Sequence, residues 1–267
     1  MLHRAICFDI DGTLLDSQGV LRPRVVQALH ALHDSGTILL VATAVPQRFA
    51  RLKVAQAPFL CQTGVFMGGA HLVDESTGLS YQARMDREIT QDLVRSLADQ
   101  HPDLQILLQV DADYHALRFP LPNETPEAWG YAADALLPFD EALTRPCLKI
   151  VAWDEERDLT PTLTDLQARL AKQVSLFPSE DGRGMWASAC GVDKGSGLLR
   201  LLAHLQIAPA ETAVIGDHIP DVDMFRVAGT SIAMGNAPAA VQAEATWVTA
   251  SNDDDGVVCA IERLRAG

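Results

Sequence analysis

The chain has 267 residues, of which 48% are hydrophobic and 21% charged, and its formal net charge is −14 at pH 7. This length and apolar content allow a substantial buried core, in one large domain or in two of moderate size. The acidic balance argues against nucleic acids and anionic membrane surfaces as routine partners, because both would be repelled. The five cysteines are scattered without metal-ligand spacing, and the chain has no apolar run of membrane-spanning length and no signal-peptide layout. Together these features indicate a cytoplasmic protein.

The first element in chain order is a short apolar run at residues 5–8, which predicts a buried strand that ends in the carboxylate of Asp9. A second acid, Asp11, follows two residues later, and Gly12 allows a tight turn after it. A carboxylate at the edge of a core costs free energy unless a partner compensates it. Mg²⁺ would be such a partner; one carboxylate can then attack phosphorus while the other moves a proton. The alternative is an Asx-type turn in which Asp11 and Gly12 are purely structural.

Helices and apolar strands then alternate at both ends of the chain. Apolar residues at helical spacing predict a helix over residues 23–33, followed by a strand over 37–42 that ends at Thr43. Later in the chain we expect a helix around 198–205, strands at 212–215, 231–234 and 247–248, and a closing helix at 257–265. Continuous apolar strands that alternate with helices predict an α/β fold with a Rossmann-like, doubly wound parallel sheet.

The middle of the chain has a different pattern. Pairs of adjacent strands, grouped apart from the helices, favour an α+β insert with an antiparallel sheet. A Pro-rich connection through Pro120, Pro122 and Pro126, with a helix after it, interrupts this segment. We therefore expect a core formed by residues 1–81 and 187–267, and an inserted α+β cap formed by residues 82–186.

Polar residues follow three strands of the expected core, namely Asp9, Thr43 and Asp217. Ligands of parallel sheets bind beyond the carboxyl ends of the strands, so these three side chains are expected to converge at one edge. Asp221 lies four residues after Asp217, where Pro220 can open a helix, and the two acids can form one wall of a metal site. Either acid can instead be a helix N-cap.

These residues carry a family resemblance. The stretch from Asp9 to Leu15 resembles motif I of the haloacid dehalogenase superfamily of phosphatases. Thr43 is similar to motif II, Lys194 to motif III, and Gly216-Asp217 with Asp221 to motif IV, in the family's order. The insert between Thr43 and Lys194 resembles the large cap of the Cof-type (type IIB) subgroup.

The resemblance implies a Mg²⁺-dependent phosphatase that hydrolyses a small phosphomonoester metabolite, with a sugar phosphate as the first candidate. Asp9 would be the nucleophile that forms an aspartyl-phosphate, and Asp11 the general acid and base. Thr43 and Lys194 would bind the phosphoryl group. The cap would set substrate specificity, and the resemblance leaves the oligomeric state open.

The same resemblance implies a set of Mg²⁺ ligands. Asp9, Asp217 and the backbone carbonyl of Asp11 would bind the ion, while Asp221 would hold a metal-bound water or orient Lys194.

The chain departs from the family pattern at two motifs. Motif II usually continues Thr-Gly-Arg, whereas here it is Thr43-Ala44-Val45, and Arg48 is the nearby cation that could replace the arginine. Motif IV usually has Asn before its last Asp, and here Pro220 stands there. Two alternatives therefore remain: a phosphomutase that uses the same aspartyl-phosphate, and a non-catalytic protein that binds phosphorylated metabolites through a degenerate site.

Overall fold

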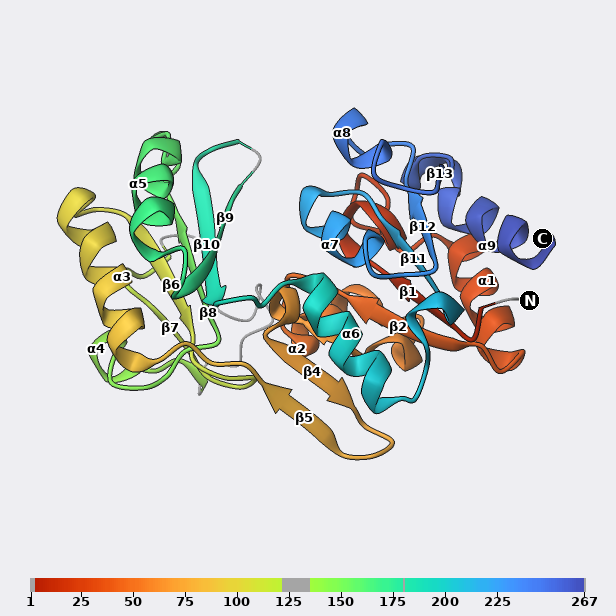
Figure 1. Cartoon of the computed structure of the whole chain (residues 1–267), viewed down its shortest axis with the longest axis horizontal. Helices are drawn as coiled ribbons and strands as arrows, with labels where there is room; N and C mark the ends of the chain where they lie inside the picture. The colour runs from red at the N-terminus through yellow and green to blue at the C-terminus, as the bar shows by residue number, and fades with distance from the viewer. Residues whose placement is uncertain (1–2, 122–134, 180, 267) are drawn as a thin grey trace. The chain divides into compact units, whose positions relative to one another are not determined.

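The computed structural model describes residues 3–121, 135–179 and 181–266, and Figure 1 shows the course of the chain. It divides into two compact units. The first combines Met1–Tyr81 with Asp193–Gly267, and the second is Gln82–Val192. None of the helices in these described ranges is long and apolar enough to cross a membrane.

The first unit contains, among the described residues, an eight-stranded sheet in the order β13-β12-β11-β1-β2-β3-β4-β5. Its strands are β1 (Ala5–Phe8), β2 (Ile38–Ala42), β3 (Thr63–Phe66), β4 (His71–Asp74), β5 (Leu79–Gln82), β11 (Thr212–Gly216), β12 (Thr230–Ala233) and β13 (Trp247–Val248). The strands from β13 to β3 are parallel to their neighbours, whereas β4 is antiparallel to β3. The expected α/β class is confirmed, and the parallel sheet continues at one edge into strands that the sequence did not reveal.

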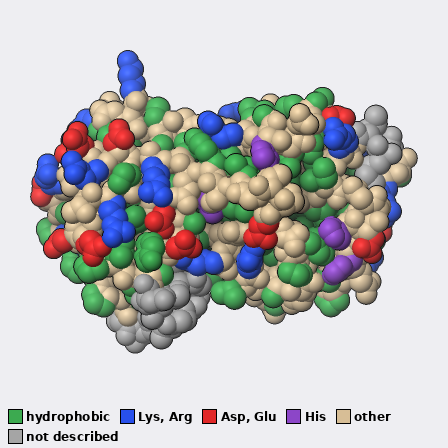
Figure 2. Space-filling view, turned by 90° about the horizontal axis from the view of Figure 1, so that it is seen from below, with side chains coloured by type: hydrophobic (Ala, Val, Ile, Leu, Met, Phe, Trp, Pro, Cys, Tyr) green, Lys and Arg blue, Asp and Glu red, His purple; other side chains and the backbone are tan. Residues whose placement is uncertain are grey.

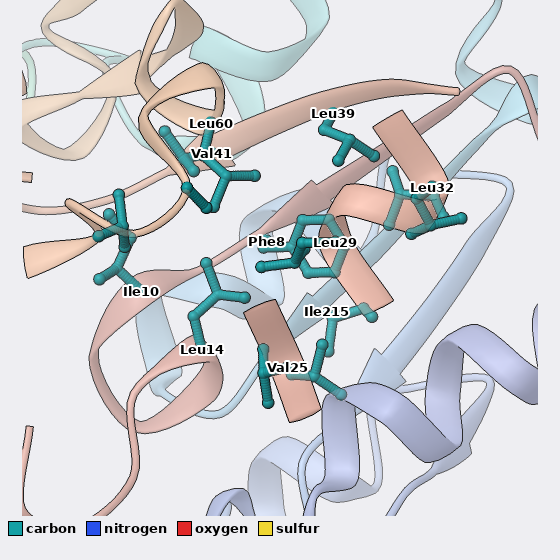
Figure 3. Close-up of a cluster of buried hydrophobic side chains, with 14 of the residues drawn as sticks. Phe8, Ile10, Leu14, Val25, Leu29, Leu32, Leu39, Val41, Leu60 and Ile215 are labelled. Atoms are coloured by element: carbon teal, nitrogen blue, oxygen red, sulfur yellow. The ribbon is translucent and has the colours of Figure 1, made fainter. Parts of the chain in front are cut away.

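Helices cover both faces of this sheet. On one face, α1 (Pro23–Asp34) and α9 (Gly256–Ala266) pack on the alternate residues Ile6 and Phe8 of β1. Figure 3 shows Phe8 beside Leu29 of α1, with Ile215 of β11 close by. The other face is covered by α6 (Lys194–His204), α7 (Val222–Phe225) and α8 (Ala239–Gln242), which pack with Ala5 and Cys7 of β1. Both faces of β1 are buried, which explains its uninterrupted apolar sequence.

The second unit contains, within the part of the chain described, a five-stranded sheet in the order β7-β6-β8-β10-β9. Its strands are β6 (Gln105–Gln109), β7 (His115–Leu117), β8 (Lys149–Trp153), β9 (Val174–Pro178) and β10 (Gly184–Ala189), and all the neighbouring pairs are antiparallel. Helices α3 (Arg87–Gln100), α4 (Phe139–Ala142) and α5 (Thr160–Leu170) contribute to one apolar core with this sheet. Figure 1 shows α3 and α5 on the same side of the strands.

Two features of the second unit differ from the sequence expectations or lie beyond them. The compact unit ends at Val192 rather than at residue 186, and β10 lies wholly within it, with Ala189 paired to Val174 of β9. The connection through Pro122 and Pro126 and the helix expected after it fall largely in residues 122–134, outside the described residues.

Over the face drawn in Figure 2, the acidic and basic side chains that are described intermingle and form no broad patch of one sign.

Candidate active site

Three buried aspartates meet at the carboxyl edge of the parallel sheet. Asp9 directly follows β1 and Asp217 directly follows β11, and these strands are neighbours because Phe8 pairs with Ile215. Asp221 lies one short turn beyond Asp217. One carboxylate oxygen from each aspartate lies within 4.8 Å of the others, and the residues are 5%, 2% and 0% exposed in sequence order. Parallel pairing therefore brings together acids more than 200 residues apart.

Lys194 joins this cluster from the first turn of α6. The helix begins with a capping box, in which the Asp193 carboxylate accepts a hydrogen bond from the amide of Ser196 at 2.7 Å and the Ser196 hydroxyl accepts one from the Asp193 amide at 3.0 Å. The lysine Nζ donates to Oδ1 of Asp9 and to Oδ1 of Asp221, each at 2.6 Å. The capping box thus fixes the helix end that presents the ammonium group to both acids.

The charges of this cluster do not balance. Burial and the neighbouring charges of Asp221 and Asp217 together raise the pKa of Asp9 to about 8, against the opposing effect of Lys194. Burial lowers the pKa of Lys194, but Asp221 and Asp9 outweigh this and raise it, so the lysine stays protonated. When all three aspartates are ionised, the one ammonium group compensates one of three carboxylates. A divalent cation would compensate the other two, and oxygen donors of this kind are the ligands that Mg²⁺ prefers.

Backbone and side-chain donors hold the two motif IV acids. The Oδ2 atom of Asp221 accepts hydrogen bonds from the amides of Asp217 and His218, each at 2.9 Å. The Thr13 hydroxyl donates to Oδ1 of Asp217 at 2.8 Å, and the His218 Nδ1 lies 2.6 Å from Oδ2 of Asp217. These contacts orient both carboxylates toward the cluster.

Gly12 and Asn236 form the turn that lies against the Asp217 carboxylate. Gly12 has a φ of +79°, and a Cβ at this position would lie 2.2 Å from Oδ2 of Asp217. The Asn236 Nδ2 donates to the Gly12 carbonyl at 2.9 Å and reaches Oδ2 of Asp217 at 3.4 Å. Only glycine satisfies both the backbone conformation and the close approach.

Thr43 and Asp11, the two remaining candidates from the sequence, have different surroundings in the structure. Thr43 directly follows β2, the neighbour of β1, and it is buried; its Oγ1 accepts a hydrogen bond from the Val45 amide at 3.3 Å. The carboxylate of Asp11 does not belong to the buried acidic cluster formed by the described residues. Its Oδ1 accepts a hydrogen bond from Nζ of Lys53 at 2.5 Å.

Sequence reasoning missed several residues of this region. Thr13 lies within the stretch that resembles motif I, and Asn236 follows β12. Neither was given a role, and their contacts with Asp217 span 204 and 19 residues. Lys53 had no signal at all, because nothing in its local pattern distinguishes it from a surface lysine.

Comparisons with known proteins identify the family of this chain. The family model of the haloacid dehalogenase-like hydrolases matches residues 6–261. A phosphoglycolate phosphatase of Archaeoglobus fulgidus is 28% identical over 261 residues, which cover 98% of this chain and 96% of the relative. A Bacillus subtilis 5-amino-6-(5-phospho-D-ribitylamino)uracil phosphatase is 26% identical over 297 aligned positions and covers 99% of each chain. The crystal structure of a haloacid dehalogenase-like hydrolase from Bacteroides thetaiotaomicron has a TM-score of 0.82, 25% identity, and covers 98% of this chain and 99% of its own.

Proposed function

Since the chain belongs to the haloacid dehalogenase-like hydrolases, we propose that it is a Mg²⁺-dependent phosphatase that hydrolyses a small phosphomonoester through an aspartyl-phosphate. The observation that carries the proposal is the unbalanced cluster of Asp9, Asp217 and Asp221 around a single lysine. An excess of buried negative charge destabilises the folded protein, so the cluster has no purely structural explanation. It could bind a cation, and the cation could in turn bind a phosphoryl group.

In the proposed first step, a carboxylate oxygen of Asp9 attacks the phosphorus atom of the ester. Lys194 holds Oδ1 of Asp9, so we assign the attack to Oδ2. The bond between phosphorus and the ester oxygen breaks, and Asp11 donates a proton to the leaving oxygen. The products of this step are a free alcohol and a phosphoryl group bonded to Asp9.

In the second step, Asp11 accepts a proton from a water molecule that attacks the phosphoryl group. The bond between phosphorus and Asp9 breaks and inorganic phosphate is released, so that Asp9 is again a carboxylate and Asp11 again carries its proton. Thr43 and Lys194 would bind the phosphoryl oxygens during both steps. Such positioning and charge compensation account for most of the catalysis of phosphoryl transfer.

The site also fits the expected cofactor. We assign Asp9, Asp217 and the backbone carbonyl of Asp11 as ligands of Mg²⁺, with Asp221 orienting Lys194 through their contact at 2.6 Å. The ion would supply positive charge against the phosphoryl oxygens. The same two positive charges would compensate the excess of the acidic cluster.

We assign the choice of substrate to the second unit, Gln82–Val192, as an inserted cap. A sugar phosphate is our first candidate, and phosphoglycolate, which the Archaeoglobus relative's name specifies, is the second. The acidic charge and the scattered cysteines support a small cytoplasmic metabolite, rather than a nucleic acid or a membrane, as the partner.

The test is hydrolysis of p-nitrophenyl phosphate by the purified protein with Mg²⁺ and with a chelator. We expect turnover only with Mg²⁺, and we expect Asp9→Asn to lower kcat by at least about 10³-fold because it removes the attacking oxygen. Asp34→Asn, an exposed acid at the end of α1, is the matched control and keeps full activity. Undiminished turnover by Asp9→Asn would exclude Asp9 as the nucleophile.

Product analysis separates the proposal from the alternatives. With a panel of sugar phosphates, a phosphatase releases inorganic phosphate, whereas a mutase yields an isomer and no free phosphate. Binding of these esters without either product would identify a non-catalytic binding protein instead.

A further inference from the structure

The carboxylate of Asp11 has a single cation beside it among the described residues, and that cation comes from a separate helix. Lys53, the last residue of α2 (Gln47–Lys53), donates through Nζ to Oδ1 of Asp11 at 2.5 Å. The lysine side chain is 24% exposed, while that of Asp11 is 50% exposed. The contact joins residues 42 positions apart, so it is not a product of local chain geometry.

Helix α2 holds Lys53 in a defined place. Ala50 of this helix is fully buried, and the side-chain amide of Gln47 donates to the Cys61 carbonyl at 2.7 Å. Arg51 forms an ion pair with Glu75, which also accepts a hydrogen bond from Gln47 at 3.0 Å. The helix is therefore anchored along its length.

The ammonium group of Lys53 has a second contact besides Asp11. It lies 4.9 Å from the ring centroid of Phe49, one turn earlier in the helix. A cation–π contact and the negative end of the helix dipole both favour a positive charge at this point. Lys53 is thus a preorganised cation and not a freely moving surface side chain.

We propose that Lys53 is a positioning residue for Asp11: because Lys53 holds Oδ1, Oδ2 is the oxygen that carries the proton, gives it to the leaving oxygen and later takes one from water. This proposal rests on the proposed function and adds a residue that neither the motifs nor the buried acidic cluster contain. Proton transfer needs the donor within hydrogen-bond reach of the receiving atom, and an unrestrained carboxylate at the end of a loop samples many orientations.

Neither fold stabilisation nor phosphate binding accounts for the pair as well. Half-exposed ion pairs add little to stability, so the contact contributes little to the fold. A direct role in binding the substrate phosphate is the other alternative, and Lys53 would then have to give up its contact with Asp11. Such a role also makes a different kinetic prediction, since it would appear in KM.

The test compares Lys53→Met with Lys53→Arg on two matched esters, phenyl phosphate and p-nitrophenyl phosphate. Phenolate needs protonation as it leaves, whereas p-nitrophenolate departs readily without it. We expect Lys53→Met to lower kcat for phenyl phosphate about tenfold or more, to lower it much less for p-nitrophenyl phosphate, and to leave KM within about twofold. Lys53→Arg should recover most of the lost activity, because it restores a donor to Asp11.

A double variant and a control complete the design. Asp11→Asn with Lys53→Met should lose no more activity than Asp11→Asn alone, because the lysine acts through the aspartate. Arg4→Met is the control: it removes a cation that pairs with Glu211 ahead of the amino end of β1, and its kinetics should stay those of the wild type.

Several results would overturn the proposal. They are equal losses on the two esters, a rise in KM with unchanged kcat, an additive loss in the Asp11→Asn background, or failure of Lys53→Arg to recover any activity. If Lys53→Met does not fold, Lys53→Ala compared on the same two esters decides instead. A wild-type protein that hydrolyses neither ester with Mg²⁺ would overturn the proposed function and this inference with it. The results named above overturn the role of Lys53 alone, because they require an active wild-type protein.

Discussion

Two buried aspartates at strand ends of the same sheet have opposite electrostatic environments. Asp74 closes β4 and is 1% exposed, while Asp9 follows β1 and is 5% exposed. Burial raises the pKa of both carboxyl groups. For Asp74, hydrogen bonds from Ser76, Thr77 and His204 outweigh burial and lower the pKa to about 2, whereas the pKa of Asp9 rises to about 8.

The neighbours of each carboxylate explain the difference. Asp74 accepts from the Ser76 hydroxyl at 2.7 Å, the Thr77 hydroxyl at 2.8 Å and the His204 Nε2 at 3.0 Å. Asp9 shares its one ammonium partner with a second carboxylate, and a third lies close by. Hydrogen-bond donors compensate the charge of a buried carboxylate, which can then have a purely structural role. Neighbouring carboxylates instead add negative charge, which a cation has to compensate. Burial alone therefore does not identify a catalytic carboxylate.

Of the changes that test this comparison, the removal of Lys194 should have the largest effect on the free energy of unfolding. Lys194→Met removes the ammonium group that Asp9 and Asp221 share, and we expect the free energy of unfolding of the metal-free protein to fall by about 3–5 kcal/mol. Mg²⁺ should recover part of that loss, because it supplies charge to the same carboxylates. The measurement is chemical denaturation with and without Mg²⁺.

The matched control is Lys53→Met, which removes a lysine from a half-exposed partner and should cost less than about 1 kcal/mol. If the two variants lose the same stability, the acidic cluster does not need Lys194 in the way its geometry implies.

The contrast between the two aspartates also marks what the sequence could predict. The strand before Asp9 was expected at residues 5–8 and is observed there, because an uninterrupted apolar run is a local signal. The family expected from the motifs is confirmed, and the convergence of Asp9 with Asp217 followed from a rule about parallel sheets.

Residues 44–81 were harder to interpret. Strands β3, β4 and β5 have four residues each, and α2 buries one residue, Ala50, so neither a strand period nor a helical stripe is visible. For this reason the sequence could predict neither the pairing of Lys53 with Asp11 nor the exposure of the Asp11 side chain. Both depend on how helices and strands are placed in space.

The pH dependence of stability gives the next largest effect. The unfolded chain releases the Asp9 proton near its usual pKa of 3.8, and the folded metal-free protein holds it to about 8. Between these values the folded state binds more protons, so the stability from this group is complete below about pH 4 and is lost as pH rises toward 8. Each pH unit in this window costs at most about 1.4 kcal/mol from one group.

Thermal melting of the chelator-treated protein from pH 5 to pH 8 measures this slope. Saturating Mg²⁺ should flatten it, since a bound cation favours the carboxylate, and Asp9→Asn should flatten it without any metal. A metal-free Asp9→Asn protein that keeps the wild-type slope would assign the proton to another group.

Gly12→Ala tests whether Asp217 must lie where it does. The new methyl group would meet Oδ2 of Asp217 at 2.2 Å, and the backbone φ of +79° adds strain, so we expect a loss of roughly 1–3 kcal/mol together with weaker Mg²⁺ dependence of activity. Gly19→Ala is a close control, because Gly19 has a φ of +75° but open space around it. Backbone strain is common to both, so only the displacement of Asp217 should weaken the response to Mg²⁺.

Asp74→Asn gives the smallest effect and tests the structural side of the comparison. The amide cannot accept as many hydrogen bonds as the carboxylate, and its NH₂ group faces donors, so we expect a loss of about 1–3 kcal/mol in the free energy of unfolding. The rate on p-nitrophenyl phosphate should not change, because the partners of Asp74 named above lie outside the acidic cluster. Asp103→Asn, in an exposed pair with Arg157, is the control, and its free energy of unfolding should stay close to that of the wild type. A large fall in kcat for Asp74→Asn with unchanged stability would mean that satisfied and unsatisfied buried acids cannot be separated by their donors.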